Sequence, residues 1–279
     1  MIFAILLYII IKLTSEGMTI KSICILSAET ISNTLLIQTW FPSLKASTSL
    51  NGVAWYLSVM LFLYFCFPYI VKYIKKVSNK KAIVIMSFSI IIAQICVALL
   101  VKMFSESVYN WFTYCFPIFR LGDFIIGCNL GYLLTSKKAS DNKDGLFKAS
   151  IVEIFAIGTT VLAFVFARAQ IHNFVLNVFQ NWTTIWIIIA TIWVYLFYQC
   201  KGVITKLFTN QICIFIGNIS AYAFLIHYVI TQYYIFVRNY MNWNFPEYIN
   251  LTLIFVQYVV SILLSYIYST LTKEKIETA

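Results

Sequence analysis

Six runs of about twenty mostly apolar residues constrain this chain most, because a helix of that length crosses the hydrocarbon core of a bilayer. They cover residues 53–74, 82–103, 109–135, 148–168, 182–200 and 249–271. Three segments are weaker: 212–237 carries more polar groups, 22–40 has scattered polar residues with Glu29, and 1–11 is about half a span. The sequence therefore predicts an all-α polytopic transmembrane helix bundle of about eight membrane segments, the first one partial.

The composition excludes a soluble protein. Charged residues make up 11% of the chain, against about 25% in typical globular proteins. Hydrophobic residues reach 61%, and the mean hydropathy is +0.85. A soluble domain of 279 residues could not bury that much apolar surface, and so apolar a chain is not intrinsically disordered. The lipid bilayer is therefore the expected surrounding.

Lysine and arginine residues are distributed unevenly between the two sides of the membrane that these segments would cross. If each segment spans once, fifteen of the twenty positive charges lie on one side. They lie in 12–21, 72–81, 137–148, 201–206 and 273–275, whereas the opposite side has Lys45, Lys102, Arg168 and Arg238. The positive-inside rule makes the lysine-rich side, and with it the carboxyl terminus, cytoplasmic. The net charge of +10 thus reports topology, and no nucleic-acid partner is expected.

The seven cysteines carry no sign of a metal centre. Nearly all lie inside apolar runs, and the sequence has no Cys-x-x-Cys motif and no Cys/His cluster. Neither a metal site nor a disulfide framework is expected, and we interpret these cysteines as small hydrophobic residues of helices.

One ion pair is expected at membrane depth, where isolated charges are costly. Arg120 and Asp123 stand three residues apart, so they share a helix face and can pair. They could line a substrate cavity, or they could be a structural pair that fixes helix packing. Gly127 and Gly131 follow in Gly-x-x-x-Gly spacing, which favours close approach of another helix.

Three further ionisable residues fall in the predicted spans. His227 could act as a general base near neutral pH, although a single helical histidine is commonly a neutral hydrogen-bonding partner. Glu29 shares a helix face with polar residues, and that face could line a wet cavity or make a buried polar contact. Glu153 lies near the cytoplasmic end of its span and is expected to reach the membrane interface.

Three stretches, in order, resemble motifs of the integral-membrane acyltransferase family 3, the sugar and polysaccharide O-acyltransferases. They are Trp55–Ser58 with Tyr64 and Pro68, then Phe119–Phe124 with Gly127 and Gly131, then Gly217–Ser220 with Tyr222 and Leu225–His227. The resemblance covers about residues 1–270 and implies a single membrane acyltransferase-like domain over 1–279. It also implies transfer of an acyl group, usually acetyl from acetyl-CoA, to a hydroxyl of a sugar or polysaccharide acceptor.

The chain departs from the family at the catalytic pair, a basic residue followed eleven positions later by histidine. The two histidines are His172 and His227, and the residues eleven positions before them are Val161 and Ile216. No catalytic residue is therefore assigned. By the resemblance, the first helices of the family would lie upstream of Met1, and the chain could be inactive alone.

The remaining motif residues are candidates for a substrate cavity. Arg120 could hold an anionic group or pair with Asp123, and Trp55 and Tyr64 could stack on a sugar. His227 and Glu29 complete this set. Acyl-CoA is expected as donor substrate, and no bound cofactor is expected.

The expected location is the bacterial plasma membrane. A glycan transporter or flippase is an alternative, but nine Gly, four Pro and no visible half-repeat disfavour it. A non-catalytic remnant, or a subunit that needs a partner, is another alternative.

Overall fold

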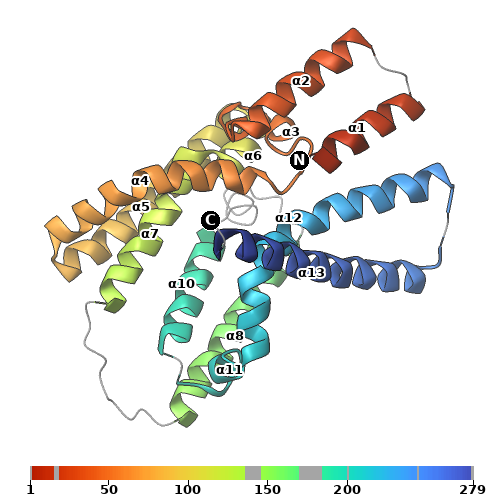
Figure 1. The fold of residues 1–279 in the computed structure, drawn as a ribbon. Helices are drawn as coiled ribbons and strands as arrows, with labels where there is room; N and C mark the ends of the chain where they lie inside the picture. Colours follow the sequence, from red (N-terminus) through yellow and green to blue (C-terminus); the bar gives the residue numbers. More distant parts are fainter. Residues whose placement is uncertain are drawn as a thin grey trace. The chain divides into compact units, whose positions relative to one another are not determined.

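The computed structural model describes residues 2–15, 19–135, 146–169, 184–199, 201–243 and 245–277. All regular elements in these ranges are helices (Figure 1). They are α1 (Ile2–Ser15), α2 (Ile20–Thr34), the 3-10 helix η1 (Gln38–Trp40), α3 (Leu44–Ser47), α4 (Trp55–Val77), α5 (Lys80–Phe104), α6 (Glu106–Cys115), α7 (Pro117–Thr135), α8 (Leu146–Arg168), α10 (Thr184–Gln199), α11 (Val203–Leu207), α12 (Gln211–Tyr240) and α13 (Glu247–Glu277).

The helices confirm a multi-pass all-α membrane fold. Within the described ranges, six are long and apolar enough to cross a bilayer, with α6 and α7 counted as one, and α10 is a shorter apolar helix. The expected span over 22–40 is wrong at its carboxyl end, because α2 ends at Thr34 and Leu36 has a φ of 56°. Fifteen helical residues measure about 22 Å, which is shorter than the roughly 30 Å hydrocarbon core.

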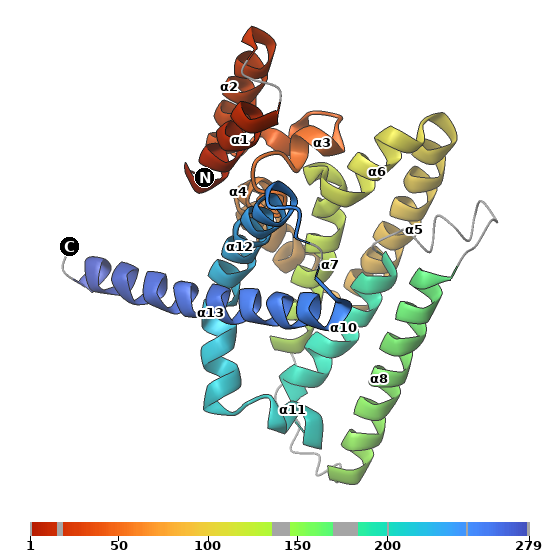
Figure 2. The ribbon, with the colours of Figure 1, turned by 90° about the vertical axis from the view of Figure 1, so that its right-hand side faces the viewer.

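Contacts divide the chain into two compact units, which are described separately. Unit 1 comprises Met1–Gln38, Thr48–Tyr56 and Asn210–Ala279, and unit 2 comprises Thr39–Ser47 and Leu57–Thr209. In unit 1, α12 and α13 pack together as a helical hairpin, and Figure 2 shows α13 crossing α12. Their contacts follow an antiparallel order: Phe215 packs against Tyr266, and the Tyr234 hydroxyl donates to Asn250 at 3.3 Å.

Unit 2 brings the lysine-bearing helix ends together. Asn129, late in α7, donates to Ser87, early in α5, at 2.9 Å, so these helices are antiparallel. Tyr198 at the end of α10 donates to the carbonyl of Leu134 at the end of α7, at 3.2 Å. The start of α8 lies beside α11, which follows α10. The starts of α5 and α8 and the ends of α7 and α10 therefore share one end of the unit, as the charge pattern predicted.

Candidate functional site

The span formed by α6 and α7 is broken between Cys115 and Pro117. Phe116 is extended, with a ψ of 122°, and proline has no N–H to donate to the preceding turn. The last carbonyls of α6 therefore lack donors from a following helical turn. Arg120 provides donors for one of them, because its Nε and Nη2 donate to the carbonyl oxygen of Tyr114 at 2.8 and 2.6 Å.

The same guanidinium forms the expected ion pair. Nη1 of Arg120 lies 3.0 Å from Oδ2 of Asp123, and the two side chains are 14% and 18% exposed. Gln94 of α5 donates from Nε2 to Oδ1 of Asp123 at 2.7 Å and to the carbonyl of Phe119 at 3.0 Å. Both carboxylate oxygens thus have donors, and the pair joins α5, α6 and α7. This geometry favours the structural interpretation of the pair.

Gly122 makes room for this network. A Cβ added there would lie 2.7 Å from Nε2 and 2.8 Å from Cδ of Gln94. The expectation that Gly127 and Gly131 admit a neighbouring helix is wrong for the described residues, since no described atom lies within 4 Å of a Cβ at either position. The glycine that a close contact requires is Gly122, more than one turn earlier, and what approaches it is the Gln94 side chain, not the backbone of a helix.

Aromatic rings surround the break. Phe116 packs against Trp111 with ring centroids 4.7 Å apart and against Trp40 at 5.9 Å. The indole N–H of Trp111 donates to the carbonyl of Thr39 at 3.0 Å, and the hydroxyls of Thr39 and Ser58 are 2.6 Å apart. Ser58, from the first motif, is thereby connected to the region of the second motif.

Tyr64 does not join that cluster. Its side chain is 63% exposed on α4. Its assignment to a sugar pocket stays a prediction.

His227 lies in unit 1, in the middle of α12. Its Nδ1 is 3.2 Å from the carbonyl oxygen of Ala223, which can only accept a hydrogen bond. In the tautomer whose Nδ1–H donates to this carbonyl, Nε2 has the lone pair. The ring stacks on Tyr258 of α13, with centroids 5.9 Å apart and an angle of 15° between the planes. His227 thus presents one basic nitrogen on a ring held by its helix and by an aromatic neighbour.

An under-bonded amide lies one helical turn from His227. The Thr231 hydroxyl is 2.8 Å from the carbonyl of His227 and 3.1 Å from Oε1 of Gln257. One hydroxyl hydrogen cannot serve both acceptors at once. Nε2 of Gln257 is buried and has no partner among the described residues. Turned about its Cγ–Cδ bond, the same amide would donate to the Thr231 hydroxyl, so the hairpin holds a buried amide with one polar atom whose partner could be a ligand.

The first and third motifs meet in unit 1. Asn51 donates from Nδ2 to the carbonyl of Leu225 at 3.2 Å, and the rings of Tyr56 and Phe224 are 5.4 Å apart. A Cβ at Gly52 would collide with the Tyr228 ring, so only glycine permits this approach. Trp55 is half-buried at the start of α4, directly after this loop. The structure thus brings Trp55 and Tyr56 into the unit that holds His227.

Glu29 is half-buried in α2, also in unit 1. The polar residues around it bond mainly to their own backbone: Ser32 and Asn33 both donate to the carbonyl of Glu29, at 3.1 and 2.9 Å. Ser22 caps the start of the helix together with Thr19. These bonds favour a buried polar contact over a water-lined face.

The sequence of this chain matches one known protein family. The family model described as an acyltransferase domain matches residues 1–270, which run through both units. The chain belongs to acyltransferase family 3. No curated protein matches the chain, and no solved structure matches it. The multi-pass fold and the family together make it a membrane acyltransferase.

One carboxylate of this acyltransferase is enclosed by protein groups. Glu153, which was expected to extend to the membrane interface, is only 1% exposed in unit 2. The amides of Ile204 and Thr205 donate to its two oxygens at 2.9 and 3.2 Å, and the Thr205 hydroxyl donates at 2.6 Å. Gly202 contacts the carboxylate so closely that a Cβ would collide with it. Glu153 therefore ties α11 to α8, a contact over some fifty residues that no local pattern indicates.

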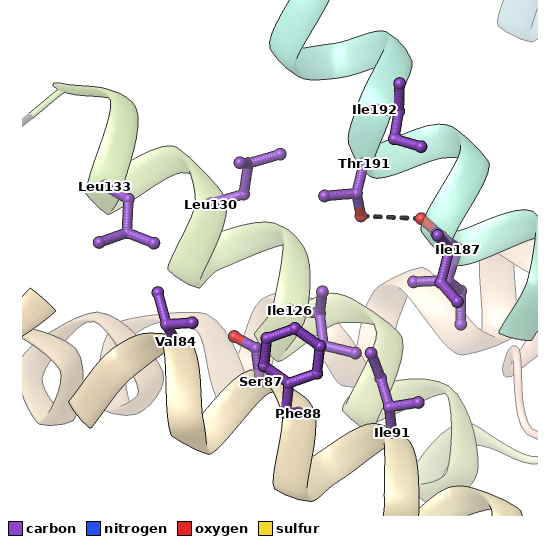
Figure 3. Close-up of a pocket in the computed structure, with 11 residues that line it drawn as sticks. Val84, Ser87, Phe88, Ile91, Ile126, Leu130, Leu133, Ile187, Thr191 and Ile192 are labelled. Carbon is purple, nitrogen blue, oxygen red and sulfur yellow. Dashed lines mark hydrogen bonds between the residues drawn. The ribbon is translucent and has the colours of Figure 1, made fainter. Parts of the chain in front are cut away.

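An apolar groove lies between α5, α7 and α10 of the acyltransferase (Figure 3). It measures about 230 Å³, and aliphatic side chains with Phe88 line most of it. Its hydroxyls are occupied, since Thr191 donates to the carbonyl of Ile187 at 2.7 Å and Ser87 to that of Ile83 at 3.1 Å. The groove suits hydrocarbon, and both of its hydroxyl hydrogens are already used within the helices.

Proposed function

We propose that this chain acts in the transfer of an acyl group, specifically acetyl, from acyl-CoA to a hydroxyl of a cell-surface sugar or polysaccharide. The setting would be the bacterial plasma membrane, with the carboxyl terminus in the cytoplasm. The observation that carries the proposal is the acyltransferase match over residues 1–270. The lysine-rich helix ends of unit 2 support a cytoplasmic side to which a soluble acyl donor has access.

The reaction needs a base for the acceptor hydroxyl. As the sugar oxygen bonds to the thioester carbonyl carbon, its proton passes to the base and the C–S bond breaks, releasing the CoA thiolate, which then takes up a proton. Among the described residues His227 fits this need best, because its ring presents Nε2 with a lone pair. The Gln257 amide, whose Nε2 has no partner among the described residues, could bind an oxygen of the sugar acceptor beside His227.

The family's basic–histidine pair is absent from this sequence, which raises the question of whether the chain alone can catalyse acyl transfer. Since Val161 and Ile216 precede the two histidines at the family spacing, proton removal by such a pair would need residues beyond these 279. His227 could replace that pair or could only bind the acceptor. Activity measured with the 279-residue chain alone, and again in membranes of the native host, distinguishes these roles.

The test uses a host strain in which the gene is disrupted. Its membranes should transfer less radiolabelled acetyl from acetyl-CoA to surface glycan, and the wild-type gene should restore the transfer. His227→Gln should restore about 100-fold less, or lower still, as expected for loss of a general base. His172→Gln is the matched control and should restore transfer fully.

One result would overturn the proposed reaction, and a second would overturn only the role of His227. Unchanged acetylation after disruption would remove acyl transfer, and measurement of glycan export would then test the transporter alternative. Full activity of His227→Gln would retain the reaction but remove His227 as its base.

A further inference from the structure

A second cavity, of about 290 Å³, lies at the lysine-rich end of unit 2. Its lining comes from the start of α8, the end of α10 and the residues that lead into α11. The polar and charged members are Lys148, Glu153, Tyr195, Gln199 and Lys201. The volume lies just below the roughly 300–1,000 Å³ of pockets for drug-sized ligands. The cavity therefore suits a headgroup-sized ligand rather than a whole nucleotide or sugar chain.

The charge of this lining is positive. Lys148 and Lys201 contribute two ammonium groups, and Glu153 contributes the one carboxylate. That carboxylate already accepts hydrogen bonds from Ile204 and Thr205. Two ammonium groups against this one carboxylate give the described lining a net positive charge.

The cavity is also preformed. Glu153 holds α11 against α8, and the amide of Val203 donates to the hydroxyl of Ser150 at 3.2 Å. These bonds fix the segment that carries Lys201 and Gly202 beside the start of α8. Tyr195 and Gln199 add a phenol and a carboxamide, which can donate hydrogen bonds to an anion.

We propose that this cavity is a binding site for a phosphate group at the predicted cytoplasmic face. Lysine binds phosphate as a point charge, and basic cavities between membrane helices suit lipid headgroups. Two sources share this chemistry: the headgroup of an anionic phospholipid and the phosphate of a soluble ligand. The inference rests on the cavity and its charges, and it stands whether or not the proposed acyl transfer is correct.

The experiment measures the thermal unfolding midpoint of the purified full chain in neutral detergent. The probes are phosphatidylglycerol, with phosphatidylcholine as the uncharged reference, and inorganic pyrophosphate. The variant Lys148→Gln/Lys201→Gln removes the two ammonium groups. The matched control is Lys75→Gln/Lys76→Gln, since these exposed lysines end α4 and do not line the cavity.

At least one phosphate probe should raise the midpoint of the wild type and of the control by several degrees, and the cavity variant should lose that rise. A rise with phosphatidylglycerol alone assigns the site to a lipid headgroup, and a rise with pyrophosphate alone assigns it to a soluble phosphate. Rises with both mean that the phosphate itself is recognised. The same rise in the cavity variant, or no rise in the wild type, overturns the proposal.

Discussion

Arg120 and His227 both place an ionisable group inside a membrane helix, yet their surroundings differ. Arg120 has an anionic partner in Asp123, and its other bonds go to a carbonyl that the helix break leaves without a helical donor. The described residues around His227 supply aromatic rings, a hydroxyl and an amide but no ion pair. The charged groups around Arg120 hold helices together, whereas the polar groups around His227 are not all used within the fold and could bind a ligand.

The buried amides of the two regions differ in the same way. Gln94 spends its N–H groups on Asp123 and Phe119 and leaves only its carbonyl oxygen without a partner. Among the described residues, the Gln257 amide makes one bond, to the Thr231 hydroxyl, and its other polar atom has no partner. Gln94 thus uses its N–H groups to hold the fold together, whereas Gln257 keeps one buried polar group available for a ligand.

Arg120→Ala should have the largest effect on stability. It leaves the Asp123 carboxylate buried without a cation and removes both donors to Tyr114, so the free energy of unfolding should fall by about 3–5 kcal/mol. Reversible denaturation in mixed micelles measures it. Arg168→Ala, at the exposed end of α8, is the control and should change stability by less than about 0.5 kcal/mol.

A double-mutant cycle with Asp123→Asn sharpens this test. The loss in Arg120→Ala/Asp123→Asn should be smaller than the sum of the two single losses, because neutralising the carboxylate removes its unpaired charge. Equal losses in the Arg120 and Arg168 variants would mean that the ion pair does not stabilise the break.

Replacing the two glutamines by leucine compares the regions directly. Gln94→Leu removes a hydrogen bond to a charged carboxylate and should cost about 1.5–3 kcal/mol. Gln257→Leu loses one bond to Thr231 but also removes a buried unpaired donor, so it should cost less than about 1 kcal/mol. The same denaturation assay measures both. A larger cost for Gln257→Leu would mean that its amide has a partner and is no ligand donor.

Gly122→Ala and Gly127→Ala compare a glycine that contacts another side chain with one that only fits the Gly-x-x-x-Gly spacing. The added methyl at Gly122 must displace Gln94 and should cost about 1–3 kcal/mol. At Gly127 a methyl meets open space, and the better helix propensity of alanine should stabilise by up to about 1 kcal/mol. The thermal midpoints of the two variants should therefore move in opposite directions. A drop in both would restore the helix-packing interpretation of Gly127.

His227→Gln should have a small effect on stability and, by the proposed function, a large effect on acetyl transfer. The loss of stacking on Tyr258 should cost about 0.5–1.5 kcal/mol. Denaturation and transfer activity are measured on the same preparations. A cost as large as that of Arg120→Ala would make His227 an architectural residue and remove the contrast between the two regions.

Local information in the sequence predicted most of the helices and part of the sites. Apolar runs had to become helices, because the bilayer leaves no other way to satisfy the backbone of a single span. The Arg120–Asp123 pair followed from three-residue spacing on one helix face. The end of α2 was not predicted, since the turn at Leu36 falls inside the expected span and neither glycine nor proline marks it.

Contacts between residues far apart in sequence could be decided only by the tertiary structure. Gln94 reaches Asp123 across 29 positions, and Glu153 binds the amide of Ile204 across 51. The physical reason is that backbone hydrogen bonding and burial in lipid act on each helix alone. The partner of a buried amide or carboxylate depends instead on which helices pack together. The sequence alone therefore determined an all-α membrane protein of acyltransferase type, and helix packing decided which of its polar residues maintain the fold and which leave capacity for a ligand.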